Sequence, residues 1–408
     1  MISCSRRKGN LQPVIEMKHV CMIAYTTYSS DARVRREAET VASLPGKTVT
    51  VLSLREQENP RILEKEGVLI KELNLAKYRG KSNISYILSY VRFTFLAFIE
   101  CTKLLARKSL DVVHVHNMPN FLVFAGLIPL LSGKPIILDI HDTMVETYAA
   151  KFSDRPSKTL EWVLRIEEAI CCRMARHIVC VNDIQKAALV RRNIPEKKIV
   201  VAMNVPDPKM FDLNRSTQTR PKEDKKLRIV YHGTVTKRVG VDKAIRAISK
   251  LDGRVPGLEF HIVGEGDDFE EFQKLSKILG VKNMVHFRRR VPLEELIAIL
   301  GDMDLGIVPN GRNIATELML PVKMLECIAL GIPVVAPRLM TITHYFTEDM
   351  IFYFDPDDVG SMTEAILEAS TSKETRLKKA RAALRFLEMH GWESHKSDFI
   401  GMYRGLEK

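Results

Sequence analysis

The chain has 408 residues, enough for two domains at roughly 150 residues per domain, and its hydrophobic content of 46% is ample for globular folding. Its formal charge of +12 favours anionic partners such as nucleotide sugars, phospholipid headgroups, polyprenyl phosphates or nucleic acid. We expect no nucleic-acid partner, because we find neither a recognised binding module nor a platform of aromatic residues among basic ones.

Residues 1–19 are predicted to form an N-terminal tail before the first strand. They contain no continuous apolar run, so we expect neither a secretory signal nor a membrane span there. The seven cysteines are odd in number, lack metal-ligand spacing and stand in apolar surroundings such as Ile178-Val179-Cys180-Val181. This pattern predicts buried free thiols in a cytoplasmic protein.

Apolar runs of strand length alternate with helix-like segments, which is typical of parallel sheets with helices on both faces. We predict strands at 20–25, 48–54, 112–116, 135–140 and 177–181 in the first half, and at 228–231, 259–263, 284–287, 305–308 and 333–335 in the second. The polar, proline-containing stretch 206–227 reads as a linker. We therefore predict an N-terminal domain over 20–205, a C-terminal domain over 228–385 and a terminal helix over 386–408.

The segment 84–99 (ISYILSYVRFTFLAFI) is rich in aromatic residues and lies between two basic clusters. The clusters are Lys77, Arg79 and Lys81 before it, and Lys103, Arg107 and Lys108 after it. Arg92 interrupts the segment, which is too short for a clear membrane span. Two interpretations stay open: a helix at an anionic membrane surface, or a buried helix of the domain.

Two histidine patterns follow predicted strands in the first half. His141 and Asp142 end the strand at 135–140, where Asp142 can cap the next helix and His141 can pack beside it. His114 and His116 share one face of their strand and, with His141, raise the question of a metal site. No carboxylate or thiolate completes such a site at diagnostic spacing, so we expect no bound metal.

The strand at 228–231 runs into His232-Gly233-Thr234, a glycine turn followed by Lys237 and Arg238. Gly233 and Thr234 allow close backbone approach, and the two cations can neutralise a diphosphate; the alternative is a loop with two solvated cations.

A second glycine-containing turn, Gly264-Glu265-Gly266, lacks the third glycine of a dinucleotide loop and precedes two further acids. We interpret it as a tight turn, which argues against a dehydrogenase.

The segment 321–335 places Lys323 in the first turn of a predicted helix that Gly331 ends. A cation is disfavoured there by a few tenths of a kcal/mol, roughly, because the helix dipole is positive at that end. A phosphate at this position satisfies both Lys323 and the unpaired backbone N–H groups. Glu326, three residues on, can accept hydrogen bonds from ribose hydroxyls. The alternative is a surface Lys–Glu pair.

The pattern Pro-x-Lys-x-x-Glu followed by Ala-Leu-Gly-x-Pro-Val-Val resembles the donor-nucleotide segment of family 4 glycosyltransferases, retaining enzymes of the GT-B fold. Blocks that resemble the same family, in its usual order, lie at 25–38, 111–117, 137–142, 201–208 and 231–242. The similarity covers most of the chain, from about residue 20 to about residue 406. The ordered combination is far more specific than any single block.

This resemblance implies an α/β fold of two facing, doubly wound Rossmann-like domains with an interdomain cleft. It implies retaining transfer of a sugar from a nucleotide diphosphate sugar to an acceptor hydroxyl on a glycan or a lipid-linked molecule. His141 then faces the donor sugar, and the terminal helix crosses back to the N-terminal domain. We expect no cofactor and no metal, because two cations and a helix dipole can supply the charge that Mg²⁺ supplies elsewhere.

The sequence departs from the family pattern at two places. Val239 stands where members often carry a lysine, so we assign the diphosphate clamp to Arg238 first and Lys237 second. Eight residues, not the usual seven, separate Glu317 from Glu326, so Glu317 either approaches the donor sugar or is a loop carboxylate facing solvent. Two other functions stay open: a GT-B nucleotide-sugar epimerase, and a non-enzymatic anion-binding protein at the membrane surface.

Overall fold

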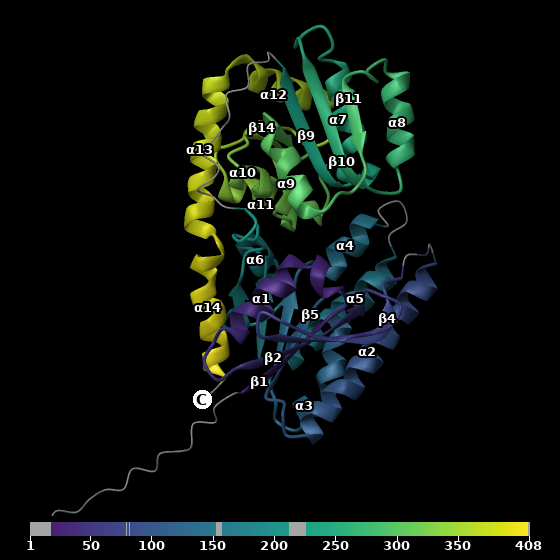
Figure 1. Cartoon of the computed structure of the whole chain (residues 1–408), viewed down its shortest axis with the longest axis vertical. Coiled ribbons are helices and arrows are strands. Elements are labelled where there is room, and N and C mark those ends of the chain that lie inside the picture. Colours follow the sequence, from purple (N-terminus) through teal and green to yellow (C-terminus); the bar gives the residue numbers. More distant parts are fainter. Residues whose placement is uncertain (1–17, 79, 81, 152–156, 212–225, 407–408) are drawn as a thin grey trace, which may run out of the picture. The chain divides into compact units, whose positions relative to one another are not determined.

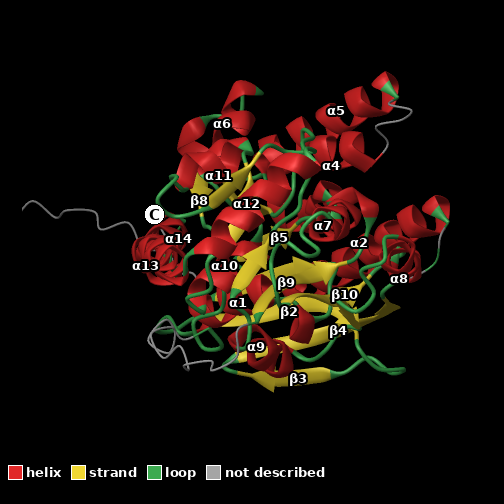
Figure 2. Cartoon of the chain, turned by 90° about the horizontal axis from the view of Figure 1, so that it is seen from above, coloured by secondary structure: helices red, strands yellow, loops and turns green. Residues whose placement is uncertain are grey.

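A computed structural model describes residues 18–78, 80, 82–151, 157–211 and 226–406 (Figure 1). Its strands, yellow in Figure 2, form two sheets with helices between them along the chain. By packing, the chain divides into a unit of residues 1–139, 174–178 and 397–408 and a unit of residues 140–173 and 179–396. The predicted domain bounds stay a prediction, and most of the predicted tail and linker lies outside the described residues.

The first sheet has eight strands in the order β3-β4-β2-β1-β5-β6-β7-β8. Its strands are β1 (His19–Ala24), β2 (Thr48–Arg55), β3 (Ile62–Lys65), β4 (Val68–Ala76), β5 (Val112–His116), β6 (Ile136–Ile140), β7 (His177–Cys180) and β8 (Ile199–Val201). β1 pairs in parallel with β2 and β5, whereas β3 pairs antiparallel with β4. All five predicted strands are present; β3, β4 and β8 were not predicted.

The helices of this half are α1 (Ala32–Ala42), α2 (Asn83–Ala106), α3 (Leu127–Leu131), α4 (Met144–Lys151), α5 (Lys158–Met174) and α6 (Asp183–Arg191). Side-chain caps fix where several of them begin. Asp31 accepts a hydrogen bond from the N–H of Val34 at the start of α1, and Asn182 accepts one from the N–H of Gln185 at the start of α6. Each cap satisfies a backbone donor that the first helical turn leaves unpaired.

The second sheet has six strands in the order β11-β10-β9-β12-β13-β14, and every pair is parallel. Its strands are β9 (Leu227–Thr234), β10 (Leu258–Glu265), β11 (Val285–Arg288), β12 (Leu305–Ile307), β13 (Val334–Pro337) and β14 (Phe352–Phe354). All five predicted strands are present, and β14 was not predicted. β9 lies between β10 and β12, so the residues that follow it stand at the middle of the sheet's carboxyl edge.

The helices of this half are α7 (Val241–Ser249), α8 (Phe269–Ile278), α9 (Leu293–Gly301), α10 (Val322–Ala329), α11 (Met340–Tyr345), α12 (Val359–Thr371), α13 (Lys373–His390) and α14 (Trp392–Gly405). The core joins the sheet to α7, through residues such as Ile229 and Phe260 of the strands and Ile245 and Ile248 of the helix. Each fully buried aliphatic or aromatic side chain of this kind contributes about 1.5–3 kcal/mol. The core therefore fixes β9 and its carboxyl end firmly.

The terminal helix and the cysteines were also subjects of prediction, and the crossing of that helix to the N-terminal domain stays a prediction. Among the described residues, 397–406 belong to the same compact unit as β1 to β5, and the hydroxyl of buried Tyr403 hydrogen-bonds to Nδ1 of His114. The six cysteines within the described residues are free and buried, as the sequence predicted. Burial raises the pKa of thiols such as Cys172 and Cys327, so these cysteines are protonated packing residues at neutral pH.

Candidate functional site

The carboxyl end of β9 presents exposed backbone at Gly233 and Thr234. Gly233 has φ +118°, a backbone conformation that residues with a side chain rarely adopt. A Cβ at Gly233 would lie 3.5 Å from Nζ of Lys323 and 3.7 Å from its Cε. The absence of a side chain thus leaves open backbone directly beside the Lys323 ammonium.

Helix α10 positions Lys323. It begins at Val322, one residue later than predicted, with Pro321 as the residue before the helix. Gly331 ends it with φ +71°, as predicted, and the N–H of Ile332 donates to the carbonyl of Cys327 at 2.9 Å. Lys323 is therefore the second residue of the helix, where backbone N–H groups have no helical acceptor and the dipole is positive.

The Lys323 ammonium is half-buried and carries no ion pair within the described part of the chain. Its Nζ donates a hydrogen bond to the hydroxyl of Tyr231 at 3.1 Å and lies 4.5 Å from the centroid of that ring. Burial lowers the pKa of Lys323 to about 8; the Arg238 charge acts in the same direction, while Glu326 and Cys327 oppose it. The site therefore holds a cation that the protein itself compensates only in part.

Glu326 does not form the surface pair with Lys323 that the alternative interpretation required. Its Oε2 instead accepts a hydrogen bond from Nε2 of His232, a buried residue of β9, at 2.7 Å. Among the described residues, the Glu326 side chain has no other hydrogen-bond partner. One carboxylate oxygen is thus held in place and the other is available to a ligand. No role for His232 or Tyr231 was predicted from the sequence.

Arg238 and Lys237 differ in what they contact. Arg238 is exposed and has no ion pair with any described residue, and its charge adds to burial in lowering the pKa of Lys323. Burial raises the pKa of Tyr231, and the Arg238 charge opposes that rise. The Lys237 ammonium instead pairs with Glu271 at 2.6 Å and is 59% exposed. The geometry therefore places Arg238 within electrostatic reach of Lys323, and the order Arg238 before Lys237 stays a prediction.

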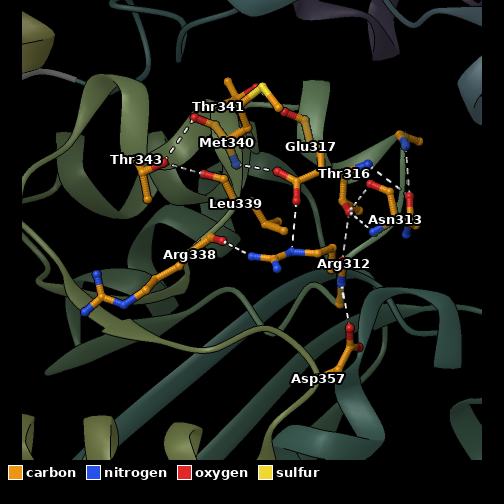
Figure 3. A network of polar contacts seen from close by, with 12 residues as sticks. Arg312, Asn313, Thr316, Glu317, Arg338, Leu339, Met340, Thr341, Thr343 and Asp357 are labelled. Carbon is orange, nitrogen blue, oxygen red and sulfur yellow. Dashed lines mark hydrogen bonds and ion pairs between the residues drawn. The ribbon is translucent and has the colours of Figure 1, made fainter.

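Glu317 lies in a short 3-10 helix, Thr316–Leu318, at the centre of the polar network in Figure 3. One carboxylate oxygen accepts the N–H of Met340, the first residue of α11, and the other lies 2.9 Å from Nε of Arg312. Arg312 in turn donates to the carbonyl of Arg338 and, from its backbone N–H, to Asp357. Both carboxylate oxygens are thus engaged, one with α11 and the other with Arg312, and a role of Glu317 at the donor sugar stays a prediction.

His141 follows β6 directly and is half-buried, whereas Asp142 is exposed. The role of His141 at the donor sugar also stays a prediction.

Two carboxylates lie beside His114 and His116 in space, although none stands at diagnostic spacing in the sequence; the expectation of no bound metal stays a prediction. Glu37 of α1 and Asp139 of β6 join them in a fully buried group whose ligand atoms all lie within 4.8 Å of one another. The two imidazole rings stack with centroids 4.4 Å apart, and Nδ1 of His116 lies 3.1 Å from Asp139. The sequence could not reveal this group, because its carboxylates come from elements far apart in the chain.

Arg33 supplies a positive charge to that buried group. Its guanidinium contacts Asp139 at 2.6 Å and Glu37 at 3.1 Å. Burial alone would lower the pKa of Arg33, but the two carboxylates raise it above its ordinary value, so the residue stays charged. The group is therefore a buried network that contains its own ion pairs within one unit, whereas Lys323 has no ion pair among the described residues.

Comparison with known proteins identifies two adjoining family matches. The model described as "Glycosyltransferase Family 4" matches residues 39–209, and that described as "Glycosyl transferases group 1" matches residues 214–385. A GDP-mannose-dependent alpha-(1-6)-phosphatidylinositol monomannoside mannosyltransferase of Mycolicibacterium smegmatis is 39% identical over 104 residues, which are 25% of this chain and 27% of that relative. The alignment thus spans little more than a quarter of the relative's length.

Solved structures are similar over nearly the whole chain. Sucrose-phosphate synthase from Thermosynechococcus elongatus has a TM-score of 0.75 at 15% identity, with 95% of this chain and 99% of the other covered. The Anabaena protein HepE in complex with UDP-glucose has a TM-score of 0.69 at 12% identity, with 95% and 99% covered. At these identities the similarity is one of fold, and it confirms the predicted α/β class with two Rossmann-like domains of the GT-B type.

Proposed function

The chain belongs to the glycosyltransferases of family 4, and on this premise we propose that it transfers a sugar from a nucleoside diphosphate sugar to an acceptor hydroxyl with retention of anomeric configuration. The donor nucleotide binds at the carboxyl end of β9 and the start of α10. Its diphosphate contacts Lys323, Arg238 and the backbone at Gly233 and Thr234. This end of a doubly wound sheet is where ligands of such folds bind.

The observation that carries the proposal is the environment of Lys323. The ammonium is half-buried at a helix start, lies beside the open backbone of Gly233 and has a pKa lowered to about 8. Burial and the positive end of the helix dipole make the Lys323 charge unfavourable in the unliganded protein, and a bound anion removes this cost. A diphosphate supplies that anion and accepts hydrogen bonds from the unpaired N–H groups at the start of the helix.

The same residues can act on the chemical step. When the bond between the anomeric carbon and the donor phosphate oxygen breaks, the electron pair stays on the nucleoside diphosphate, which becomes more negative. Lys323, Arg238 and the dipole of α10 then interact more strongly with the leaving group than with the intact donor, and this difference accelerates the reaction. The acceptor hydroxyl oxygen bonds to the anomeric carbon, and its proton passes to the oxygen of the departing diphosphate. This arrangement supplies the positive charge from protein groups, so we infer that no metal ion is required.

Glu326 suits the ribose of the donor. Since His232 holds one carboxylate oxygen at 2.7 Å, the other can accept hydrogen bonds from the ribose hydroxyls in a fixed orientation. His141 is proposed to orient the donor sugar, and Glu317 to act on the site through the loop that it anchors. The mycobacterial relative is named for GDP-mannose and HepE was solved with UDP-glucose, so their shared donor chemistry is the nucleoside diphosphate sugar. The acceptor we propose is a glycan or a lipid-linked molecule.

A calorimetric screen of nucleoside diphosphates tests the proposal. One of them should bind saturably, and at ~100 times its dissociation constant it should stabilise the fold by about 2.7 kcal/mol. Lys323→Ala should weaken binding by about 1.5–3 kcal/mol, whereas the matched control Lys237→Ala, which removes an exposed lysine paired with Glu271, should change it far less. Binding by Lys323→Ala as tight as by the wild type would contradict the site assignment.

Three further measurements separate the reaction from its alternatives. Transfer that continues in excess chelator supports metal independence, and nuclear magnetic resonance of the product linkage reports retention or inversion. Incubation with donor alone discriminates an epimerase, because only an epimerase converts the donor into a different sugar nucleotide without an acceptor.

A further inference from the structure

Helix α2 has an outward face that no other described element covers. Its large apolar side chains Ile84, Ile87, Leu88, Val91 and Phe95 are between 49% and 80% exposed. Their spacing places them on one side of the helix, since residues three, four and seven apart share a face. A contiguous stripe of five large exposed apolar side chains on the surface of a protein marks an interaction site.

The opposite face of α2 belongs to the core of its unit. Phe93, Ala97 and Cys101 are fully buried, and the helix packs against β4 and α3. By length and composition residues 84–106 could cross a membrane. Crossing would, however, strip these inner side chains from their contacts and place Glu100, which is paired with Lys71 and Lys103, in the bilayer. The interpretation as a buried helix thus holds for the inner face, and the interpretation as a helix at a membrane surface stays a prediction for the outer one.

The charges around the stripe are positive. Arg92 lies on the helix beside the stripe, Lys77 precedes the helix, and Arg107 and Lys108 follow it; all four are exposed. None of the four has an ion-pair partner among the described residues, and Glu100, the one acidic residue of α2, is already paired. The face thus combines apolar side chains with uncompensated cations, a combination that fits the interface of an anionic bilayer.

We propose that α2 docks the protein onto the surface of an anionic lipid bilayer, with Leu88, Val91 and Phe95 inserted among the acyl chains and Arg92 reaching the headgroups. A second copy of the chain is a poorer occupant. A two-fold symmetric contact would bring the same cations together from both subunits, and their repulsion would oppose the apolar contact. None of the donor residues contributes to this face, so the inference does not depend on the proposed donor site.

Flotation of the full chain with vesicles tests the inference. Wild-type protein should float with vesicles of phosphatidylcholine and phosphatidylglycerol at low ionic strength, and much less with vesicles of phosphatidylcholine alone or at high salt. The double variant Leu88→Gln/Phe95→Gln should lower the partition coefficient roughly tenfold or more. Arg92→Gln should lower it by about fivefold on the anionic vesicles. The control Ile278→Gln, at an even more exposed apolar position of α8, should float like the wild type.

All substituted residues are exposed, so the variants should keep the wild-type melting temperature and nucleotide affinity, and these are measured alongside. The inference is overturned if the wild-type protein binds neither kind of vesicle, or if the double variant floats as well as the wild type. It is equally overturned if the wild type is a dimer that the double variant dissociates and neither binds vesicles, since a second copy then covers the stripe. Failure here leaves the donor assignment standing, because nucleotide binding is measured separately.

Discussion

Binding of a nucleoside diphosphate should be accompanied by proton uptake at Lys323. The pKa of this residue is lowered to about 8 in the unliganded protein, so at pH 8 about half of the molecules carry a neutral amine. A phosphate charge at a distance of about 4 Å contributes about 4 kcal/mol at an effective dielectric constant of 20, equivalent to about three pKa units. The liganded lysine therefore stays protonated up to at least pH 10, roughly.

The number of protons taken up follows from these two values. It should be about 0.1 per site at pH 7, about 0.5 at pH 8 and about 0.9 at pH 9. The dissociation constant should accordingly rise with pH above 8, approaching tenfold per pH unit. The phosphate groups contribute little in this range, because the last phosphate proton has a pKa of about 6.

Calorimetry in buffers of different ionisation enthalpy measures this uptake. The slope of observed enthalpy against buffer ionisation enthalpy gives the number of protons directly. Lys323→Arg is the matched control, since a guanidinium remains protonated throughout and should bind with no proton uptake from this position. A wild-type slope near zero at pH 8, or an equal slope in Lys323→Arg, would refute the assignment of the diphosphate to Lys323.

Four further outcomes are expected. Lys323→Met should raise the free energy of unfolding by up to about 3 kcal/mol at pH 7, because folding lowers the pKa of the lysine from 10.5 to about 8. This gain in stability should fade as the pH rises from 8 to 10.5. Chemical denaturation at several pH values across that range measures it. Glu326→Gln should chiefly reduce the discrimination between a nucleoside diphosphate and its 2′-deoxy analogue in calorimetry, and undiminished discrimination would exclude Glu326 as the ribose ligand. His141→Ala should lower the turnover number strongly while diphosphate affinity changes little; an equal loss of both would place His141 in the nucleotide site or in the fold. Glu317→Gln should lower the free energy of unfolding by about 1 kcal/mol through the weakened contacts to α11 and Arg312, and denaturation equal to wild type would show that this network contributes nothing.

The fold was largely readable from the sequence because its central strands are buried on both faces. Strands such as β5 and β6 are buried at every position and therefore appear as short continuous apolar runs. β3 was missed because all four of its residues are exposed, so the strand leaves no apolar run or alternation. β8 and β14 were missed because each has only three residues. Sequence periodicity identifies the centre of a sheet more readily than its edges.

The candidate site was readable only in part. Lys323 was identified because a cation in the first turn of a helix conflicts with the dipole, which is a local property of the sequence. The contact between His232 and Glu326 was missed because the two residues are 94 positions apart, and the pairing of Arg33 with Asp139 spans 106 positions. Residues so far apart in the sequence cannot be paired from the periodic spacing of side chains within one helix or strand. The fold alone brings these partners together, so their roles had to come from the structure.

The electrostatics around Lys323 explain why a cation in the first turn of α10 indicated an anion-binding site. Three influences destabilise its charge: the positive end of α10, the nearby Arg238 and partial burial. The one acidic side chain that acts on it favourably, Glu326, is itself hydrogen-bonded to His232 and makes no ion pair with the lysine. Replacing the lysine by an apolar residue would relieve all three at no cost to the helix. A cation at this position is therefore stabilised only when an external anion binds beside it. The binding free energy of that anion then includes relief of the electrostatic cost of the Lys323 charge in the unliganded protein.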